Sequence, residues 1–159
     1  MSARSASTLS VIVGTLGFAI LLATAQTPPS ESQAASGLPQ PSFGWVDVYI
    51  DSEDAPLAAY QFELAAESGD FKIVGIEGGE HAAFSAPPYY DPAALQHDRV
   101  IIAAFSTADE LPTGRTRVVR VHVMVEGDAP QYVATLAVAA TADGSRIPVS
   151  IQLEEGNLP

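Results

Sequence analysis

The chain has 159 residues, with 7 Lys and Arg against 19 Asp and Glu, and it contains no cysteine. A formal net charge of −12 argues strongly against nucleic-acid binding, which needs clustered basic side chains to displace phosphate counterions, and it disfavours an anionic membrane surface. The lack of cysteine excludes disulfides, thiol catalysis and cysteine-ligated zinc, so stability must come from burial of apolar side chains.

The first 25 residues have the three parts of a secretory signal peptide. Arg4 precedes an uncharged, largely apolar run over 9–22, which ends in the small residues Ala23-Thr24-Ala25. We expect a leader over 1–25 and a mature chain outside the cytoplasm that is secreted, periplasmic or attached to the envelope. The run is short for a membrane helix, which needs about 20 apolar residues, but an uncleaved anchor stays open as the alternative.

Residues 26–42 are predicted to form a flexible linker, and residues 43–159 a single domain. The linker holds four prolines among Ser, Gln and Ala and has no apolar period. Such a segment cannot bury enough surface to offset the entropy lost on ordering. A single lysine, Lys72, beside many alanines is typical of a GC-rich bacterial genome.

From Phe43 onward, the apolar residues follow the two-residue period of β-strands with one buried face. The alternating segments are 45–51, 60–64, 119–125 and 147–153. Three further segments, 71–76, 100–105 and 132–140, are apolar on both faces and are expected to be central strands or strands covered by a loop. Turn residues at 68–70, 111–114, 126–128 and 143–144 separate the strands. Seven short strands without a long helix predict an all-β, antiparallel β-sandwich.

A segment of about twenty residues after Gly78 breaks this rhythm. It contains Asp91 followed by Pro92, which can cap and begin a short helical turn over 92–96. Loops of about this length within a compact domain are often functional. This loop is therefore the first candidate for a binding surface.

Five side chains of this loop are candidate ligand-binding residues. Tyr89 and Tyr90 offer apolar ring faces with a hydroxyl, which suit a sugar or a partner protein. His81, His97 and Asp91 could instead hold a divalent cation. The structural alternative is that the tyrosines pack against the sheet while the histidines cap backbone groups.

A second group of candidates lies on the first strand and the turn after it. Trp45 and Tyr49 share one strand face and are about 13 Å apart at the usual strand rise, so they either form an aromatic strip for polysaccharide or cover a sheet edge. Asp51, Glu53 and Asp54 offer oxygen ligands suited to calcium, with a solvated turn as the alternative. No cofactor is expected, although calcium at this turn stays open.

The sequence contains no motif of a known catalytic centre. None of its serines lies in a Gly-x-Ser-x-Gly nucleophile elbow, and no His-Glu-x-x-His spacing is present. The carboxylates are scattered over polar strand faces. We therefore expect a non-catalytic protein.

Several segments resemble the cohesin family. Pro56–Leu64 is similar to an early cohesin strand, 98–105 resembles a second one, and 111–114 and 117–125 follow in the order of that family. The Tyr-Asp-Pro step that usually follows the early cohesin strand is missing after Leu64. The resemblance covers about 46–153, and it implies a jelly-roll-like sandwich of the superfamily shared with some carbohydrate-binding modules.

These observations favour a secreted or envelope-associated, cohesin-like module that binds another protein. The alternatives are a carbohydrate-binding module, which would use Trp45 and Tyr49 or Tyr89 and Tyr90, and a calcium-stabilised adhesive or structural domain. Exposed coplanar rings would favour the sugar ligand, whereas a flat apolar sheet face would favour the protein partner.

Overall fold

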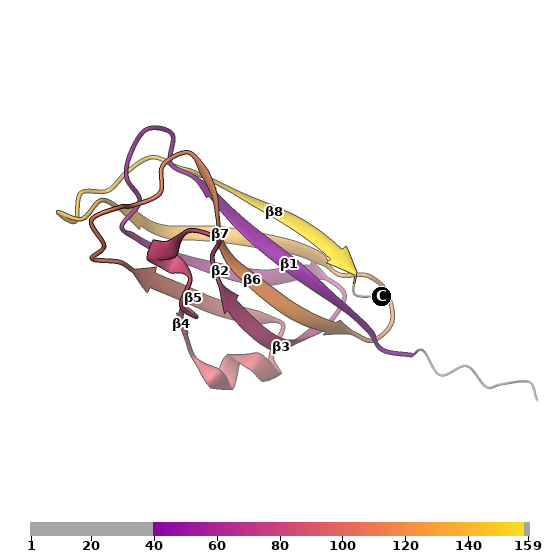
Figure 1. The fold of residues 1–159 in the computed structure, drawn as a ribbon. Helices are drawn as coiled ribbons and strands as arrows, with labels where there is room; N and C mark the ends of the chain where they lie inside the picture. The colour runs from indigo at the N-terminus through magenta and orange to yellow at the C-terminus, as the bar shows by residue number, and fades with distance from the viewer. Residues whose placement is uncertain (1–39, 158–159) are drawn as a thin grey trace, which may run out of the picture. The chain divides into compact units, whose positions relative to one another are not determined.

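The computed structural model describes residues 40–157, except for the side chain of Gln96. The chain divides after Ala35 into two units, and the described residues lie in the second, Ser36–Pro159. They form two four-stranded antiparallel sheets packed as layers, which confirms the predicted antiparallel β-sandwich (Figure 1). The predicted leader and nearly all of the predicted linker lie outside the described residues.

Each sheet combines strands from distant parts of the chain. Sheet A has the order β3 (Phe71–Gly78), β6 (Arg115–Val125), β1 (Ser42–Asp51) and β8 (Ser150–Asn157). Sheet B has the order β4 (Tyr89–Tyr90), β5 (Arg99–Phe105), β2 (Ala59–Ser68) and β7 (Gln131–Ala140). Two short 3₁₀ helices, η1 (Ala82–Phe84) and η2 (Pro92–Gln96), lie between β3 and β5 in the chain. Neither is long and apolar enough to cross a membrane, and no other helix occurs within 40–157.

The core lies between the sheets and consists of the inward side chains of alternate residues. The fully buried ones include Val46, Val48, Ile50, Tyr60, Phe62, Leu64, Val100 and Ile102. Full burial of one such side chain is worth about 1.5–3 kcal/mol, so this layer is the main source of stability. The strand faces predicted at 45–51 and 60–64 are thereby confirmed.

A β-bulge in β6 sets which side chains face outward from sheet A. Val48 pairs with Val119 and Tyr49 pairs with Arg117, so Val118 is the extra residue. Val118 and Val119 are both fully buried. Because one extra residue shifts the alternation, Arg117 and Arg120 lie three positions apart on the same outer face.

Two of the three segments expected to be central strands or strands covered by a loop lie at sheet edges. Segments 71–76 and 132–140 became β3 and β7, which lie at the ends of their sheets, whereas 100–105 became β5 and lies inside sheet B.

The segment expected at 147–153 pairs as a strand of sheet A only from Ser150. Ile147 still donates its N–H to Ala139 of sheet B at 3.0 Å, so the chain changes sheets after it.

The segment between β3 and β5 closes one side of the sandwich. It crosses from sheet A to sheet B, and η2 lies beside β3 and β5 (Figure 1). Phe84 of η1 is 3% exposed and belongs to the core. Asp91 caps η2 by accepting the Ala93 N–H at 2.9 Å, and Pro92 starts the helix, as predicted. Much of this loop therefore serves to cover the core.

Candidate binding surface

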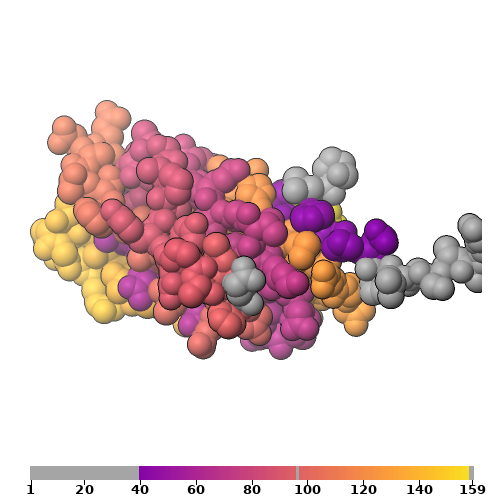
Figure 2. All heavy atoms as spheres, turned by 90° about the horizontal axis from the view of Figure 1, so that it is seen from below, coloured from indigo at the N-terminus to yellow at the C-terminus, as the bar shows by residue number. Residues whose placement is uncertain are grey.

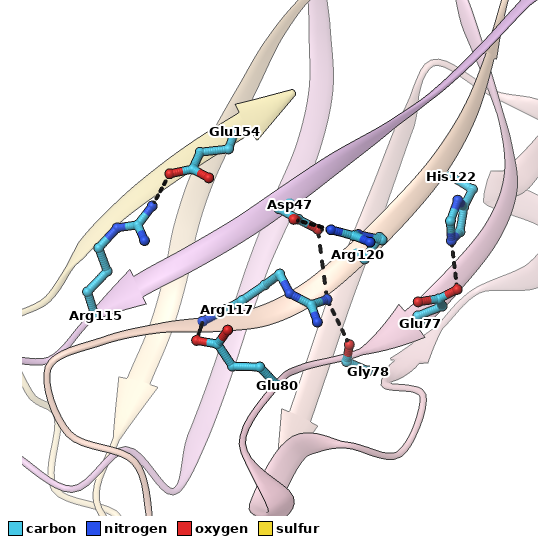
Figure 3. Close-up of polar contacts among 9 residues, drawn as sticks. All are labelled: Asp47, Glu77, Gly78, Glu80, Arg115, Arg117, Arg120, His122 and Glu154. Atoms are coloured by element: carbon cyan, nitrogen blue, oxygen red, sulfur yellow. Dashed lines mark hydrogen bonds and ion pairs between the residues drawn. The ribbon is translucent and has the colours of Figure 1, made fainter. Parts of the chain in front are cut away.

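The outer face of sheet A is organised around the buried carboxylate of Asp47 (Figure 3). Arg120 donates two hydrogen bonds to Asp47, each 2.7 Å long, and Nη1 of Arg117 lies 3.8 Å from the same carboxylate. Donating hydrogen bonds to the Asp47 carboxylate raises the pKa of the Arg120 guanidinium above its usual value, and the nearby acidic charges act in the same direction. The central charges of this face are therefore paired with one another.

Trp45 and Tyr49 lie on this face, and an arginine covers each ring. The guanidinium carbon of Arg120 lies 4.5 Å from the Trp45 ring centroid, and that of Arg115 lies 3.5 Å from the Tyr49 centroid. Gly156 of β8 lies against the Trp45 ring so closely that a Cβ there would overlap it. Both rings are half-buried on an inner strand of the sheet, and they do not cover a sheet edge, as one interpretation of the sequence proposed.

The rim of this face is also built from paired polar side chains. Arg115 bonds to Glu154 of β8, and His122 of β6 lies 2.8 Å from Glu77 of β3 (Figure 3). Every buried side-chain nitrogen or oxygen in the part of the chain that the structure describes has a hydrogen-bond partner. The outer face of sheet A is therefore largely self-neutralised, which means that its charged side chains are mostly paired with one another.

The outer face of sheet B has the opposite character. Its apolar outward side chains at one end are Tyr89 on β4, Ile101, Ala103 and Phe105 on β5, and Ala59 on β2, which we call the apolar platform. On β2, Gln61 faces outward opposite Ala103, and Glu63 opposite Ile101. Tyr89 is 69% exposed, Phe105 is 65% exposed and Ile101 is 51% exposed. The Tyr89 and Phe105 rings are nearly parallel, with planes at 6° and centroids 6.2 Å apart.

Two grooves adjoin the apolar platform. A shallow groove of about 200 Å³ runs from Ile101 past Gln61 and Glu63 to Thr135 and Ala137. A wider one of about 700 Å³ lies toward η2, and Figure 2 shows the side of the domain where the crossing segment covers the surface. The wider groove has a mixed charge; it is lined by Glu63, Asp91, His97, Asp98, Arg99 and Ile101, together with alanines of β2 and η2.

The five candidate residues of the loop have separate roles in the structure. His81 caps η1, its Nδ1 accepting the Ala83 N–H at 3.2 Å, and Tyr90 packs partly buried against the core. Asp91 caps η2 and, together with His97, lines the wider groove. Tyr89 alone joins the apolar platform.

The acidic turn after β1 is a capped backbone turn. Asp51 Oδ1 accepts the Glu53 N–H at 3.0 Å, and Glu53 has a positive φ of 52°. Within residues 40–157, no three His, Asp or Glu side chains are grouped closely enough to hold a metal ion. The structure therefore does not gather Asp51, Glu53 and Asp54, or the two histidines and Asp91, into a cation site.

Sequence reasoning missed Ile101 and Phe105, which with Tyr89 are the large exposed side chains of the apolar platform. The signal available was that 100–105 is apolar on both strand faces, which we explained by a central or covered position. Ile102 and Val100 do face the core, but Ile101 and Phe105 point outward without cover.

Searches of protein-family models, curated proteins and solved structures return no significant match to this chain. The fold and the two outer faces define it as a β-sandwich with one self-neutralised outer surface and one that carries an exposed apolar patch.

Proposed function

We propose that this chain is a non-catalytic, extracytoplasmic binding module that holds a partner protein on the apolar platform of sheet B. The observation that carries the proposal is the side-by-side exposure of Tyr89, Ile101 and Phe105 in a chain with a net charge of −12. Contiguous exposed apolar surface on a soluble domain marks an interaction site.

The composition of the apolar platform fits a protein partner. Aromatic side chains are enriched at the centres of protein interfaces, where charged residues are depleted. Ala59 and Ala103 have small side chains, so a partner with a flat surface can contact the rings of both Tyr89 and Phe105. The Glu63–Arg99 pair, at 3.8 Å, lies on the side toward η2 and would form part of a polar rim.

The cohesin resemblance supports the same surface. Its two strand segments, 56–64 and 98–105, fall on β2 and β5, which are the inner strands of sheet B. In this proposal, the chain is a cohesin-like module, and its interaction role depends on the side of the sandwich that those strands form.

Replacing the ring of Phe105 with serine tests the proposal. The Ser36–Pro159 unit would be used to isolate its partner from envelope extract, and its affinity would then be compared with that of Phe105→Ser. Loss of a ring at the centre of an interface costs about 1–3 kcal/mol, which is a weakening of roughly 5- to 150-fold. The matched control is Phe43→Ser, which removes a ring of 44% exposure from sheet A. Equal binding by Phe105→Ser and the wild type would exclude this surface.

Polysaccharide binding is the second candidate, because the exposed Tyr89 and Phe105 rings are nearly parallel. Parallel rings can stack on successive sugars. The same two variants distinguish the ligands in a sedimentation assay with insoluble polysaccharide. Retention of the wild type and of Phe43→Ser, but not of Phe105→Ser, would favour the sugar as the ligand. If none of the three were retained, polysaccharide would be excluded and the protein partner would stay the proposed ligand.

A further inference from the structure

The β7 strand has an unpaired edge over most of its length. It is the last strand of sheet B, and its partner on the other side is β2. On the free edge, Ala139 accepts the Ile147 N–H at 3.0 Å, and Ala137 accepts a hydrogen bond from Arg146 at 3.2 Å. Within residues 40–157, the stretch 131–136 has no backbone partner on that side. A strand edge of this kind can bind another strand.

The other strand edges of the domain carry features that discourage pairing. The β3 strand has Lys72, Glu77 and a bulge, β8 has Glu154 and Glu155, and β4 is two residues long. Charges, bulges and shortness are the usual means by which proteins block edge-to-edge association. The ten residues of β7, by contrast, include no charge and no proline.

The side of the sandwich next to β7 is also less well covered than the opposite side. The inward residues Tyr132 and Leu136 of β7 are only partly buried, as are Ile151 and Leu153 of β8. Phe62, on the neighbouring inner strand β2, is fully buried. On the opposite side, the crossing segment between β3 and β5 supplies the cover. Apolar surface is therefore left for a partner beside the β7 edge.

We propose that a second copy of this chain pairs with β7 in antiparallel orientation over 131–136, which makes one continuous eight-stranded sheet. A twofold axis brings the same strand against itself, and each copy supplies the backbone groups that the other lacks. Because β7 itself is uncharged, the paired strands of two strongly acidic chains place no like charges directly opposite each other. The axis passes through Val133 or through Ala134. In both registers, each side chain that faces the core lies opposite a side chain that faces the core of the other copy.

Val133→Lys provides the test. The two Val133 side chains lie directly opposite each other on the outer face when the axis passes through Val133, and diagonally across the strand pair, within reach of a lysine, when it passes through Ala134. The oligomeric state of Ser36–Pro159 would be measured by sedimentation from about 5 to about 200 μM, a range suited to interfaces of modest size. We expect the wild type to dimerise and Val133→Lys to dimerise at least tenfold more weakly, because like charges would face each other. An equimolar mixture of Val133→Lys and Val133→Glu should restore the dimer.

The matched control is Ile101→Lys, which puts the same charge on the outer face of sheet B away from its edge. It should leave the dimer intact while weakening partner binding, so this inference and the proposed function can fail separately. A monomeric wild type at about 200 μM, or a Val133→Lys dimer of unchanged affinity, would overturn the inference. Hydrogen exchange on the wild type gives a readout that needs no variant. Protection of the 131–136 amides should rise with protein concentration, and unchanged protection would also overturn it.

Discussion

Replacing Asp47 with alanine should be among the most destabilising changes on the surface of sheet A. Asp47 is 2% exposed and accepts two 2.7 Å hydrogen bonds from Arg120. Breaking a fully buried ion pair costs about 3–5 kcal/mol, because the remaining charge is left without a partner. The Arg120 side chain is 31% exposed, and water can solvate part of it, so we expect a loss of about 2–3 kcal/mol. Domains of this kind have about 5–15 kcal/mol in total, so the loss is large.

Urea unfolding followed by far-ultraviolet circular dichroism measures this loss. The fluorescence of Trp45, the single tryptophan, gives a second probe beside Arg120. The control is Glu154→Ala, which breaks the exposed pair with Arg115 and should cost no more than about 1 kcal/mol. The Asp47 loss should also persist in high salt, because a buried pair is weakly screened. If Asp47→Ala cost no more than Glu154→Ala, the central role of the carboxylate would be refuted.

Three further predictions concern the core, the crossing segment and the last turn. Burial raises the pKa of Tyr60 above 10.0, so the folded state is fully favoured below that value and loses stability as the pH rises beyond it. Tyr60→Phe should flatten this alkaline decline in a pH series of thermal melts, and at neutral pH it should cost about 1–3 kcal/mol, because the Val118 carbonyl loses its partner. Gly78→Ala should destabilise by about 1–3 kcal/mol, because its Cβ would collide with the backbone of the crossing segment. Gly75→Ala, which has room for a Cβ, should be nearly neutral, and equal melting temperatures of the two variants would argue against that packing. Hydrogen bonds from its own turn lower the pKa of Asp143 below 3.8, so the carboxylate stabilises the turn at neutral pH, and this effect is lost as the pH falls through the lowered pKa. A nuclear magnetic resonance titration that found an ordinary or raised pKa for Asp143 would contradict this.

The sequence predicted those parts of the fold that depend on neighbouring residues. The alternation of Val46, Val48 and Ile50 gave the inner face of β1, because successive strand residues point to opposite sides. Asp91 and Pro92 gave the start of η2 for a similarly local reason, since a cap and its helix lie within a few residues. The turns marked by Gly69, Gly114 and others were predicted in the same way.

The sequence could not predict which strands are neighbours. A two-residue period says which side chains share a face, but not whether a strand lies inside a sheet or at its edge, so the edge position of β7 could not be predicted. The candidate binding surface depends on that same information. Tyr89 and Phe105 are sixteen positions apart and meet because β4 pairs with β5.

The sequence by itself therefore determined that this chain forms a β-sandwich with an acidic surface, because strand periodicity and charge are properties of local residue order. The tertiary structure alone decided that one outer face is neutralised by arginine pairs while the other exposes aromatic rings. Those arrangements arise from hydrogen bonds between strands that are remote in the chain, and a register shift of one residue would reverse them.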